Sequence, residues 1–542
     1  MLGLAKPFRP LRVRPIQARG LRQARRLGVI ESQAMAAAAT HSPAGDERGR
    51  PRWSRADRVA IALVLVWVVA CFAPTLGFGF VNWDDHDFVL ENPLVVNPGS
   101  VPLLHHFTTP EVSYPVPVTI ASYRVEYALA GFEHPWLQHL VNLLIHLGSV
   151  ALLFAIARTL GMGTLGAALA AAILGVHPVV SEPVSWLTGR KDLLALCFAL
   201  ATVHLQLGGG NLSARPRRIA RSVTFLLALF SKPVAVALAP IVVLLGMVEA
   251  DVGAPWPRRL WHSIARNAPE ILLTLAYLPI AWLGYRAFGA SRAGEQVAVS
   301  LRSAWYGLGV HLALVAGVEP PCVQHLTPSM PPPFSARFDL MPLLVAGAVA
   351  GLLWALRGRA RRLAALSLAC SLLAYFPSSG VVPLKRFLAD SYLYPVLPGV
   401  GIALGLLCES LLLRRSGSLA RWLLVPALVL GLGLLAIPAS GRFRTTRDLW
   451  ADARERYPDS WRMCRNWAVA MQEIGGPAKT LEATDKCIAR FGTTNFEKNR
   501  AMALFELGRR EEAGVWMRQA LAREPTDRNV PTELLHLAAG AH

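Results

Sequence analysis

Residues 61–87 read IALVLVWVVACFAPTLGFGFVNWDDHD, an apolar run that ends in a group of acids. The apolar part, Ile61 to Phe80, has the length of about 20 residues that crosses a bilayer. Asp84, Asp85 and Asp87 follow directly, where the chain leaves the membrane. Carboxylates at membrane depth are costly and mark functional sites, whereas in a solvated loop they only cap helices. Both interpretations of these acids are open at this point.

The composition predicts a membrane protein. Apolar residues make up 53% of the chain and charged residues 17%, against about 25% charged residues in ordinary soluble domains. The formal net charge is +20, but the basic residues are scattered between apolar runs, which argues against nucleic-acid binding. The sequence has no Walker loop, Rossmann fingerprint or Gly-x-Ser-x-Gly elbow, so ATP-driven transport and serine hydrolysis lack support.

The basic clusters predict the topology, because Lys and Arg collect in cytoplasmic loops. With a cytoplasmic N-terminus, every cluster lies inside if the chain crosses the membrane about eleven times, at spans centred near residues 69, 148, 171, 200, 223, 241, 278, 348, 369, 400 and 430. The apolar segment 304–318 is then re-entrant or lies along the membrane. The predicted fold is therefore all-α and polytopic, with a non-cytoplasmic C-terminal domain.

Three regions follow from this reading. Residues 1–56 form a disordered basic cytoplasmic tail, in which either Met1 or Met35 is the true start. Residues 57–440 form the transmembrane domain, with the first outer loop at 81–135. Residues 441–542 are soluble and mixed in charge. The protein is thus expected to be integral to a membrane, either a bacterial inner membrane or, as the alternative, that of the endoplasmic reticulum.

The soluble region contains a repeat. Asn466-Trp467-Ala468 recurs as Asn499-Arg500-Ala501, a shift of 33 positions, close to the period of about 34 residues in tetratricopeptide helix pairs. We therefore predict tetratricopeptide-like repeats, which either bind a peptide or form a helical cap without a ligand. Cys464 and Cys487 fall on successive helices of one predicted repeat and could form a disulfide in an oxidising compartment.

Further polar residues lie at the borders of apolar runs, on the same predicted side as Asp84: His177, Glu182, Arg190, Lys191, Lys232, Arg386, Asp390 and Tyr392. Singly, each has an ordinary explanation, such as a cation that reaches the lipid headgroups or an acid that caps a helix. Together they place acids and cations on one membrane face. Such a site suits an anionic, lipid-linked substrate, because cations hold the phosphate and a carboxylate takes a proton from an incoming hydroxyl.

His139, Asn142 and His146 recur at helical spacing within one apolar run. Polar contacts between helices are the favoured explanation of this pattern. A ligand or metal role is the alternative.

Several of these segments resemble the membrane glycosyltransferases of the GT-C superfamily, in particular the transmembrane and tetratricopeptide O-mannosyltransferases and their bacterial relatives. The resemblance runs from about residue 57 to 440, with the repeats after it. The segments that carry it are Phe80-Val81-Asn82-Trp83-Asp84-Asp85, His139-Leu140-Val141-Asn142, Ser181-Glu182-Pro183, Gly189-Arg190-Lys191-Asp192, Ser231-Lys232-Pro233 and Ala389-Asp390-Ser391-Tyr392.

The resemblance implies transfer of a sugar, such as mannose, from a polyprenyl-phosphate donor to a hydroxyl of a protein or envelope acceptor. Asp84 and Asp85 match the family's catalytic acids. Arg190, Lys191 and Lys232 match its phosphate-holding cations, and Arg386 would replace an Arg that relatives carry at Ser391. His177, Glu182, Asp390 and Tyr392 complete the candidate site. The resemblance implies the lipid-linked sugar as substrate and no certain cofactor; a divalent metal assists some relatives, and this sequence specifies no metal site.

One departure bears on function. Relatives carry Arg or His before a Pro in the first outer loop, where this chain has Tyr114-Pro115. Two classes of function therefore stay open: a sugar transferase with an Asp general base, and a non-catalytic membrane scaffold whose repeats bind an envelope protein. A ligase that transfers lipid-linked oligosaccharide is a third, weaker alternative.

Overall fold

A computed structural model of the chain describes residues 53–97, 99, 114–133, 135–249, 254–289, 301–325, 332–380, 386–413, 420–523 and 530–540. Every regular element in these ranges is helical, so the all-α prediction is confirmed. The chain divides into two compact units, Met1–Arg58 and Val59–His542. Most of the predicted N-terminal tail, residues 1–52, lies outside the described residues.

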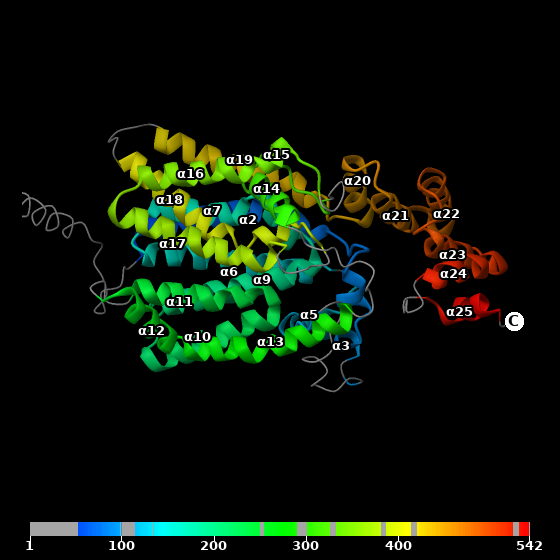
Figure 1. Cartoon of the computed structure of the whole chain (residues 1–542), viewed down its shortest axis with the longest axis horizontal. Coiled ribbons are helices and arrows are strands. Elements are labelled where there is room, and N and C mark those ends of the chain that lie inside the picture. Colours follow the sequence, from blue (N-terminus) through cyan, green and yellow to red (C-terminus); the bar gives the residue numbers. More distant parts are fainter. Residues whose placement is uncertain are drawn as a thin grey trace, which may run out of the picture. The chain divides into compact units, whose positions relative to one another are not determined.

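The eleven predicted span centres each fall within a separate helix of the bundle (Figure 1). These helices are α2 (Arg55–Phe72), α6 (Trp136–Thr159), α7 (Thr164–Val176), α9 (Arg190–Gln206), α10 (Ala214–Ser231), α11 (Leu238–Glu249), α13 (Ala268–Gly289), α16 (Met341–Ala355), α17 (Gly358–Tyr375), α18 (Leu397–Leu413) and α19 (Ala420–Gly441). Within the described ranges, four helices are long and apolar enough to cross a membrane, or five with a bent pair. The chain is an integral membrane protein, and the count of eleven crossings stays a prediction.

Close helix packing in the bundle depends on small residues. A side chain at Gly405 of α18 would lie 2.4 Å from the Gly166 carbonyl oxygen of α7, and one at Gly401 would lie 2.8 Å from that of Ala170. These glycines let the two backbones approach one another, as in other membrane helix pairs. Leu169, Ile173 and the alanines of α7 are buried in the same core cluster.

Short helices fill the connections at the end of the bundle where the acids lie. The 3-10 helix η1 (Ala73–Gly77) follows α2 directly, and the predicted first outer loop contains the π-helix η2 (His86–Leu90), α3 (Pro93–Val96) and α5 (Pro117–Ala130). Between α7 and α9 the chain forms η4 (Pro178–Val180), α8 (Ser181–Ser185) and η5 (Leu187–Gly189). The bend from α7 into this connection is 47°. The loop that carries Asp84 and the connection between α7 and α9 thereby lie close together.

Three more helices complete this part of the chain: α12 (Trp256–Arg266), α14 (Leu301–Val315) and α15 (Ala336–Asp339). The segment predicted to be re-entrant forms α14 and the turn after it. Its buried face includes Tyr306, Val310 and Leu314, which belong to the main hydrophobic core.

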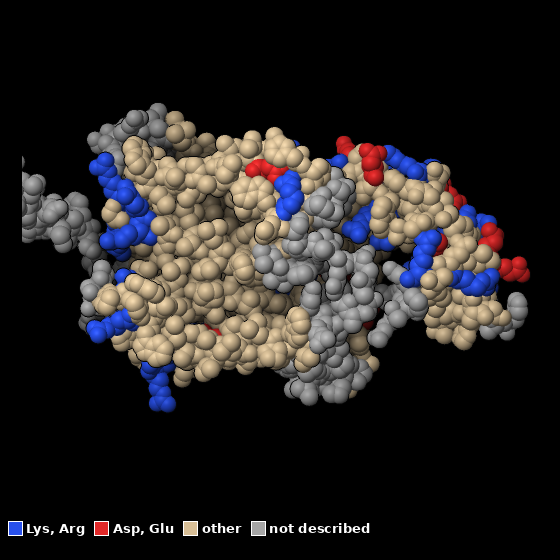
Figure 2. Space-filling view, viewed as in Figure 1, with Lys and Arg blue, Asp and Glu red and all other residues tan. Residues whose placement is uncertain are grey.

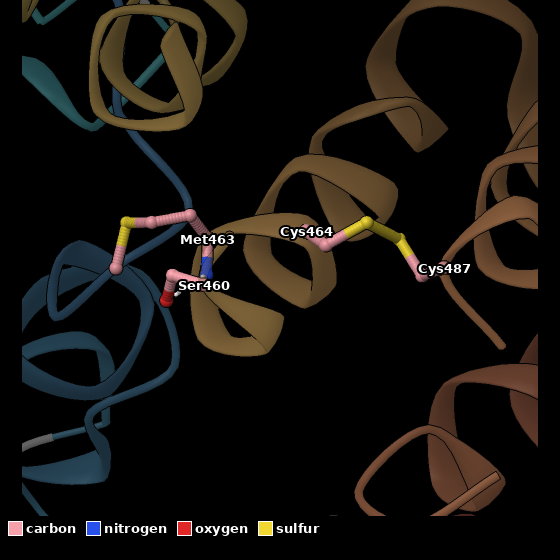
Figure 3. Close-up of a disulfide and its surroundings, with 4 residues drawn as sticks. All are labelled: Ser460, Met463, Cys464 and Cys487. Atoms are coloured by element: carbon pink, nitrogen blue, oxygen red, sulfur yellow. Dashed lines mark hydrogen bonds between the residues drawn. A yellow bond between two sulfur atoms is a disulfide. The ribbon is translucent and has the colours of Figure 1, made fainter. Parts of the chain in front are cut away.

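The C-terminal region is a series of helices: α20 (Thr446–Arg456), α21 (Trp461–Ala470), α22 (Gln472–Phe491), α23 (Glu497–Glu506), α24 (Arg510–Arg523) and α25 (Thr532–Ala539). The backbone of α22 breaks at Gly475 and Gly476, and Gly476 has φ of 65°, a value that favours glycine. A disulfide joins Cys464 of α21 to Cys487 of α22, with Cα atoms 5.9 Å apart (Figure 3). The predicted pairing is thus confirmed, whereas the assignment to the tetratricopeptide class stays a prediction.

Candidate active site

The predicted site residues come from five separate segments, one of which is the connection that carries His177 and Glu182. Asp84 lies in the loop before η2, and Lys191 lies in the first turn of α9. Lys232 ends α10, and Arg386 precedes the 3-10 helix η9 (Asp390–Leu393). Lys191 interacts electrostatically with Asp84, Lys232 and Arg386. We call the six charged residues of this group the acid–cation cluster: Asp84, Glu182, Lys191, Asp192, Lys232 and Arg386.

Asp84 and Lys191 form its most open pair. The Asp84 side chain is 32% exposed, and its Oδ2 lies 3.7 Å from Nζ of Lys191. The ammonium group lies 4.7 Å from the ring centre of Phe88 and 4.5 Å from that of Trp186. It is buried and has no hydrogen-bond partner among the described residues. An ammonium group with three free donors and a carboxylate open to solvent can both receive further ligands.

Lys232 is held by an acid that directly follows Lys191 in sequence. Its Nζ lies 2.5 Å from Oδ1 of Asp192, and 5.8 Å from the ring centre of Tyr392. Both charged side chains are at least nine-tenths buried. Tyr114 interacts electrostatically with Asp192, Tyr392 and Asp84. The residue that departs from the family pattern therefore lies beside the acid–cation cluster.

Arg386 links the cluster to the aromatic residues of the loop. Its Nη1 donates to Oε1 of Glu182 at 2.7 Å, and its Nη2 donates to the Val323 carbonyl at 2.7 Å. Its guanidinium lies 4.6 Å from the ring centre of Trp83. Nε is buried without a partner. Tyr392 donates its hydroxyl to the Arg386 carbonyl at 2.8 Å, which fixes the backbone of this loop.

Asp85 faces away from the open pair. It is fully buried and accepts hydrogen bonds from the Val81 amide at 2.9 Å, from the Thr188 amide at 3.2 Å and from the Thr188 hydroxyl. Burial raises the pKa of Asp85 to about 6, although these hydrogen bonds oppose the shift. Its oxygens are occupied by the loop and by the start of η5, so the residue joins two segments of the protein.

Arg190 is saturated within the protein. Its Nε donates to Asn142, its Nη1 to Ser122 and Glu126, and its Nη2 to Glu126 and the Gln138 carbonyl. A guanidinium group has five N–H donors, and all five are used here. The side chain is fully buried. The five donors of Arg190 are therefore used by contacts within the protein, and its role in holding the phosphate stays a prediction.

His177 and Asp390 also make contacts within the protein. Nε2 of His177 lies 3.1 Å from the Val315 carbonyl, and Nδ1 accepts from the Val179 amide at the start of η4. Asp390 lies 2.7 Å from Nε2 of His325 and accepts from the Cys322 amide at 2.9 Å. Burial raises the pKa of Asp390, although His325 opposes the shift. Both residues hold connections around the cluster.

The polar residues of α6 contact other helices, as predicted. Asn142 binds Arg190 and donates to the Trp186 and Leu187 carbonyls. His146 lies 2.8 Å from the Tyr394 hydroxyl and 3.0 Å from the Gly175 carbonyl. These bonds are interhelical, so the favoured interpretation is confirmed for Asn142 and His146.

An apolar groove leads to the cluster. It lies among α6, α9, α11, α17 and α18, and its volume is about 140 Å³. Nearly all of its lining is apolar, including Leu196, Ala199, Leu238 and Ile402. Asp192, which holds Lys232, is the one charged residue in its lining. The groove therefore joins hydrocarbon-like walls to a charged end.

The first outer loop also contacts the C-terminal helices. The Asn82 amide donates to the Thr446 hydroxyl at 2.8 Å. Trp83 stacks on Trp186 with ring centres 4.3 Å apart and meets the edge of Trp450 at 5.9 Å. The segment that carries Asp84 is therefore packed against α20.

Several contributors were not singled out from sequence. Asp192 belongs to the Gly189–Asp192 segment, and its position directly after two cations indicates an ion pair. Glu126 is the one acid of α5, which was a weaker signal for a buried partner. Trp186 and Phe88, which face Lys191, had no distinguishing sequence feature. His325 lies in a Pro-rich loop and gave no signal.

The cluster fits an anion better than a cation. Lys191 faces Asp84, and the oxygens of Asp85 are occupied, so a divalent metal at this acid pair would meet an ammonium group. Within the described residues, no group of three or more His, Cys, Asp and Glu side chains could hold a metal ion. The chemistry available here is that of a free carboxylate beside buried cations.

The chain is similar in sequence to several protein O-mannosyl-transferases. It is 34% identical to Tmtc2 of Drosophila melanogaster over 137 residues, which are 23% of this chain and 14% of that protein. It is 30% identical to TMTC4 of Homo sapiens over 171 residues, 28% of this chain and 22% of that protein. The match thus spans less than a quarter of either relative. The resemblance predicted from the motifs is confirmed, and no protein-family profile matches the chain.

Two solved structures are similar in their helical arrangement. ArnT from Cupriavidus metallidurans, bound to undecaprenyl phosphate, is 16% identical with a TM-score of 0.39, over 88% of this chain and 83% of that one. The oligosaccharyltransferase of Archaeoglobus fulgidus in the apo form is 13% identical with a TM-score of 0.43, over 85% of this chain and 71% of that one.

Proposed function

We propose that this protein is a membrane glycosyltransferase that moves a sugar from a polyprenyl-phosphate donor to a hydroxyl group on the non-cytoplasmic face. The observation that carries this proposal is the apolar groove whose lining includes Asp192, the acid that holds Lys232. An isoprenoid chain fits apolar walls, and its phosphate fits the cations at their end. The sequence similarity to protein O-mannosyl-transferases supports mannose as the sugar and a protein as the acceptor.

Asp84 is our candidate for the general base. A sugar or serine hydroxyl is a poor nucleophile at neutral pH and needs a base within hydrogen-bond reach. Of the two neighbouring acids, Asp84 is the partly exposed one, and Asp85 is buried and occupied. The proton of the acceptor hydroxyl passes to Asp84 as its oxygen bonds to the sugar carbon. Attack opposite the departing phosphate inverts the configuration at that carbon.

The leaving group is a lipid phosphate, and its growing negative charge needs preorganised cations. Among the described residues, the Lys191 ammonium and Nε of Arg386 have no hydrogen-bond partner, and Lys232 pairs with Asp192 of the groove lining. We assign the donor phosphate to these three residues. Arg190 and Asp85 we assign to positioning, because their hydrogen-bonding groups are used within the protein.

The C-terminal helices are our candidate for holding the acceptor. A cavity of about 370 Å³ lies beside the Cys464–Cys487 disulfide. Its lining includes Trp467 with Arg454, Lys479, Lys486 and Arg490. The packing of α20 against Trp83 places this region next to the loop of Asp84. The same cavity favours the alternative function, a scaffold that binds an envelope protein without catalysis.

The test is transfer from defined donors by the purified full-length chain in lipid nanodiscs. Mannose and other sugars, each on a long polyprenyl phosphate, are offered with a serine- and threonine-containing peptide. We expect transfer from one of these donors, and weak transfer from the same sugar on a two-isoprene phosphate. Ala199→Phe should narrow the groove and reduce use of the long donor more than the short one. A folded wild type that transfers no sugar from any donor, yet binds the peptide, would favour the scaffold.

A further inference from the structure

Helix α12 has two contrasting halves. At 3.6 residues per turn, one half carries the apolar residues Trp256, Leu260, Trp261, Ile264 and Ala265. The other half carries the polar and basic residues Arg258, Arg259, His262, Ser263 and Arg266. An amphipathic helix with Trp on one face and Arg on the other is typical of segments that lie in the membrane interface.

Hydrogen bonds to α11 hold one edge of this helix. Ser263 donates to the Val243 carbonyl at 2.6 Å, and Arg259 donates to the Met247 carbonyl at 2.9 Å. Asn267, just after the helix, donates to the Val242 carbonyl at 3.3 Å. All three acceptors belong to α11, so α12 is fastened at a fixed angle to a helix of the bundle.

The remaining surface of α12 is open. Trp256 is 68% exposed and Trp261 is 69% exposed. Arg258, His262 and Arg266 are also exposed. Trp side chains prefer the headgroup level of a bilayer. We therefore expect these two exposed Trp side chains to contact lipid.

The charge around α12 identifies the lipid. On the face shown in Figure 2, Lys and Arg gather at the end of the bundle where α12 lies. Within the helix, the basic half contains no acid. Anionic headgroups attract such residues by about 1 kcal/mol for each Lys or Arg near the surface, whereas zwitterionic headgroups carry no net charge to attract them.

We propose that α12 is a binding site for anionic lipid headgroups at the membrane surface. Trp256 and Trp261 enter the boundary of the acyl chains, and Arg258 meets the phosphates from the other half of the helix. This site shares no residue with the acid–cation cluster, and the proposal does not depend on the proposed glycosyltransferase function.

The test is hydrogen exchange of the segment 254–267 in the full-length protein. Nanodiscs of phosphatidylcholine alone are compared with nanodiscs that also contain phosphatidylglycerol. We expect the α12 amides to exchange more slowly with the anionic lipid, and high salt to reduce the difference. Arg258→Gln should speed exchange of the α12 amides in the anionic lipid by about fivefold, the factor that corresponds to the attraction of one surface cation. Trp261→Ser should speed exchange in both lipids.

Arg215→Gln is the matched control, because Arg215 is an exposed arginine at the start of α10. It should leave exchange in α12 unchanged. The proposal is overturned if α12 exchanges equally in the two lipids, or if Arg215→Gln and Arg258→Gln have the same effect.

Discussion

Asp84 and Lys191 contrast with their immediate neighbours, Asp85 and Arg190. Both sets hold one acid from the first outer loop and one cation from the start of α9. The first set keeps free capacity: Asp84 is partly exposed, and the Lys191 ammonium has no hydrogen-bond partner. In the second set, Asp85 accepts three hydrogen bonds and Arg190 donates five.

This difference predicts which charged groups can bind a substrate and which only hold the structure together. A charged group whose donors or acceptors are all used cannot hold a substrate without breaking bonds that are expensive to lose when buried. A charged group with unused donors gains from a ligand. Substitutions in the first set should therefore change transfer, and substitutions in the second set should change stability.

The largest effect is expected for Asp84→Asn. Asn keeps the shape of the side chain but cannot accept the proton, and loss of a general base costs about 100- to 10,000-fold in rate. The measurement is transfer by folded protein at equal concentration. Asp87→Asn, the same change at an exposed acid of the same loop, is the control and should keep its activity. Equal rates for wild type and Asp84→Asn would disprove the assignment.

Arg190→Gln should act on stability. It leaves Glu126 buried without its cation, and breaking a buried ion pair costs about 3–5 kcal/mol. The free energy of unfolding in detergent, or the folded yield where that is too low, measures this loss. Lys191→Gln at the next position should cost less, at most about 2 kcal/mol from its two aromatic contacts. An Arg190→Gln variant that is as stable as wild type but cannot use the donor would return Arg190 to the phosphate site.

Asp85 should make stability depend on pH. Its folded pKa of about 6 lies above the ordinary Asp value of 3.8, so the folded protein binds this proton more tightly than the unfolded chain. Stability should therefore fall as pH rises from about 4 to about 6, and level off above, by up to about 3 kcal/mol. Unfolding midpoints across this range should depend less on pH in Asp85→Asn than in wild type or Asp87→Asn. Parallel curves for all three would contradict the shift.

Much of the fold was predictable because it depends on hydrophobicity and helix length. The span centres lie inside helices since apolar runs of that length have few alternatives in a membrane. The disulfide was predictable because the repeat placed Cys464 and Cys487 on adjacent helices. The number of crossings was less accessible, because several helices are shorter than a full span.

The site was predictable as a group of residues and not as a set of roles. The order of the motifs predicted that Asp84, Lys191, Lys232 and Arg386 lie close together. Arg190 and Lys191 are neighbours in sequence, however, and the sequence did not show which of them uses all its donors within the protein. Their roles diverge because successive residues of a helix point about 100° apart. Glu126, which forms the ion pair with Arg190, lies on a different helix 64 positions away in sequence. No local sequence pattern predicts a contact between residues so far apart.

Lys191→Gln gives the smallest effect and the sharpest comparison. Its ammonium makes no hydrogen bond within the protein, so its removal costs little stability beyond the aromatic contacts with Phe88 and Trp186, each about 1 kcal/mol. A hydrogen bond to a charged group is worth about 1.5–3 kcal/mol. We therefore expect kcat/KM for the polyprenyl-phosphate sugar to fall about 10- to 100-fold, and Lys191→Arg to restore part of it because the positive charge returns. A variant that loses stability instead of donor use would place Lys191 with Arg190, and the contrast between the two sets would disappear.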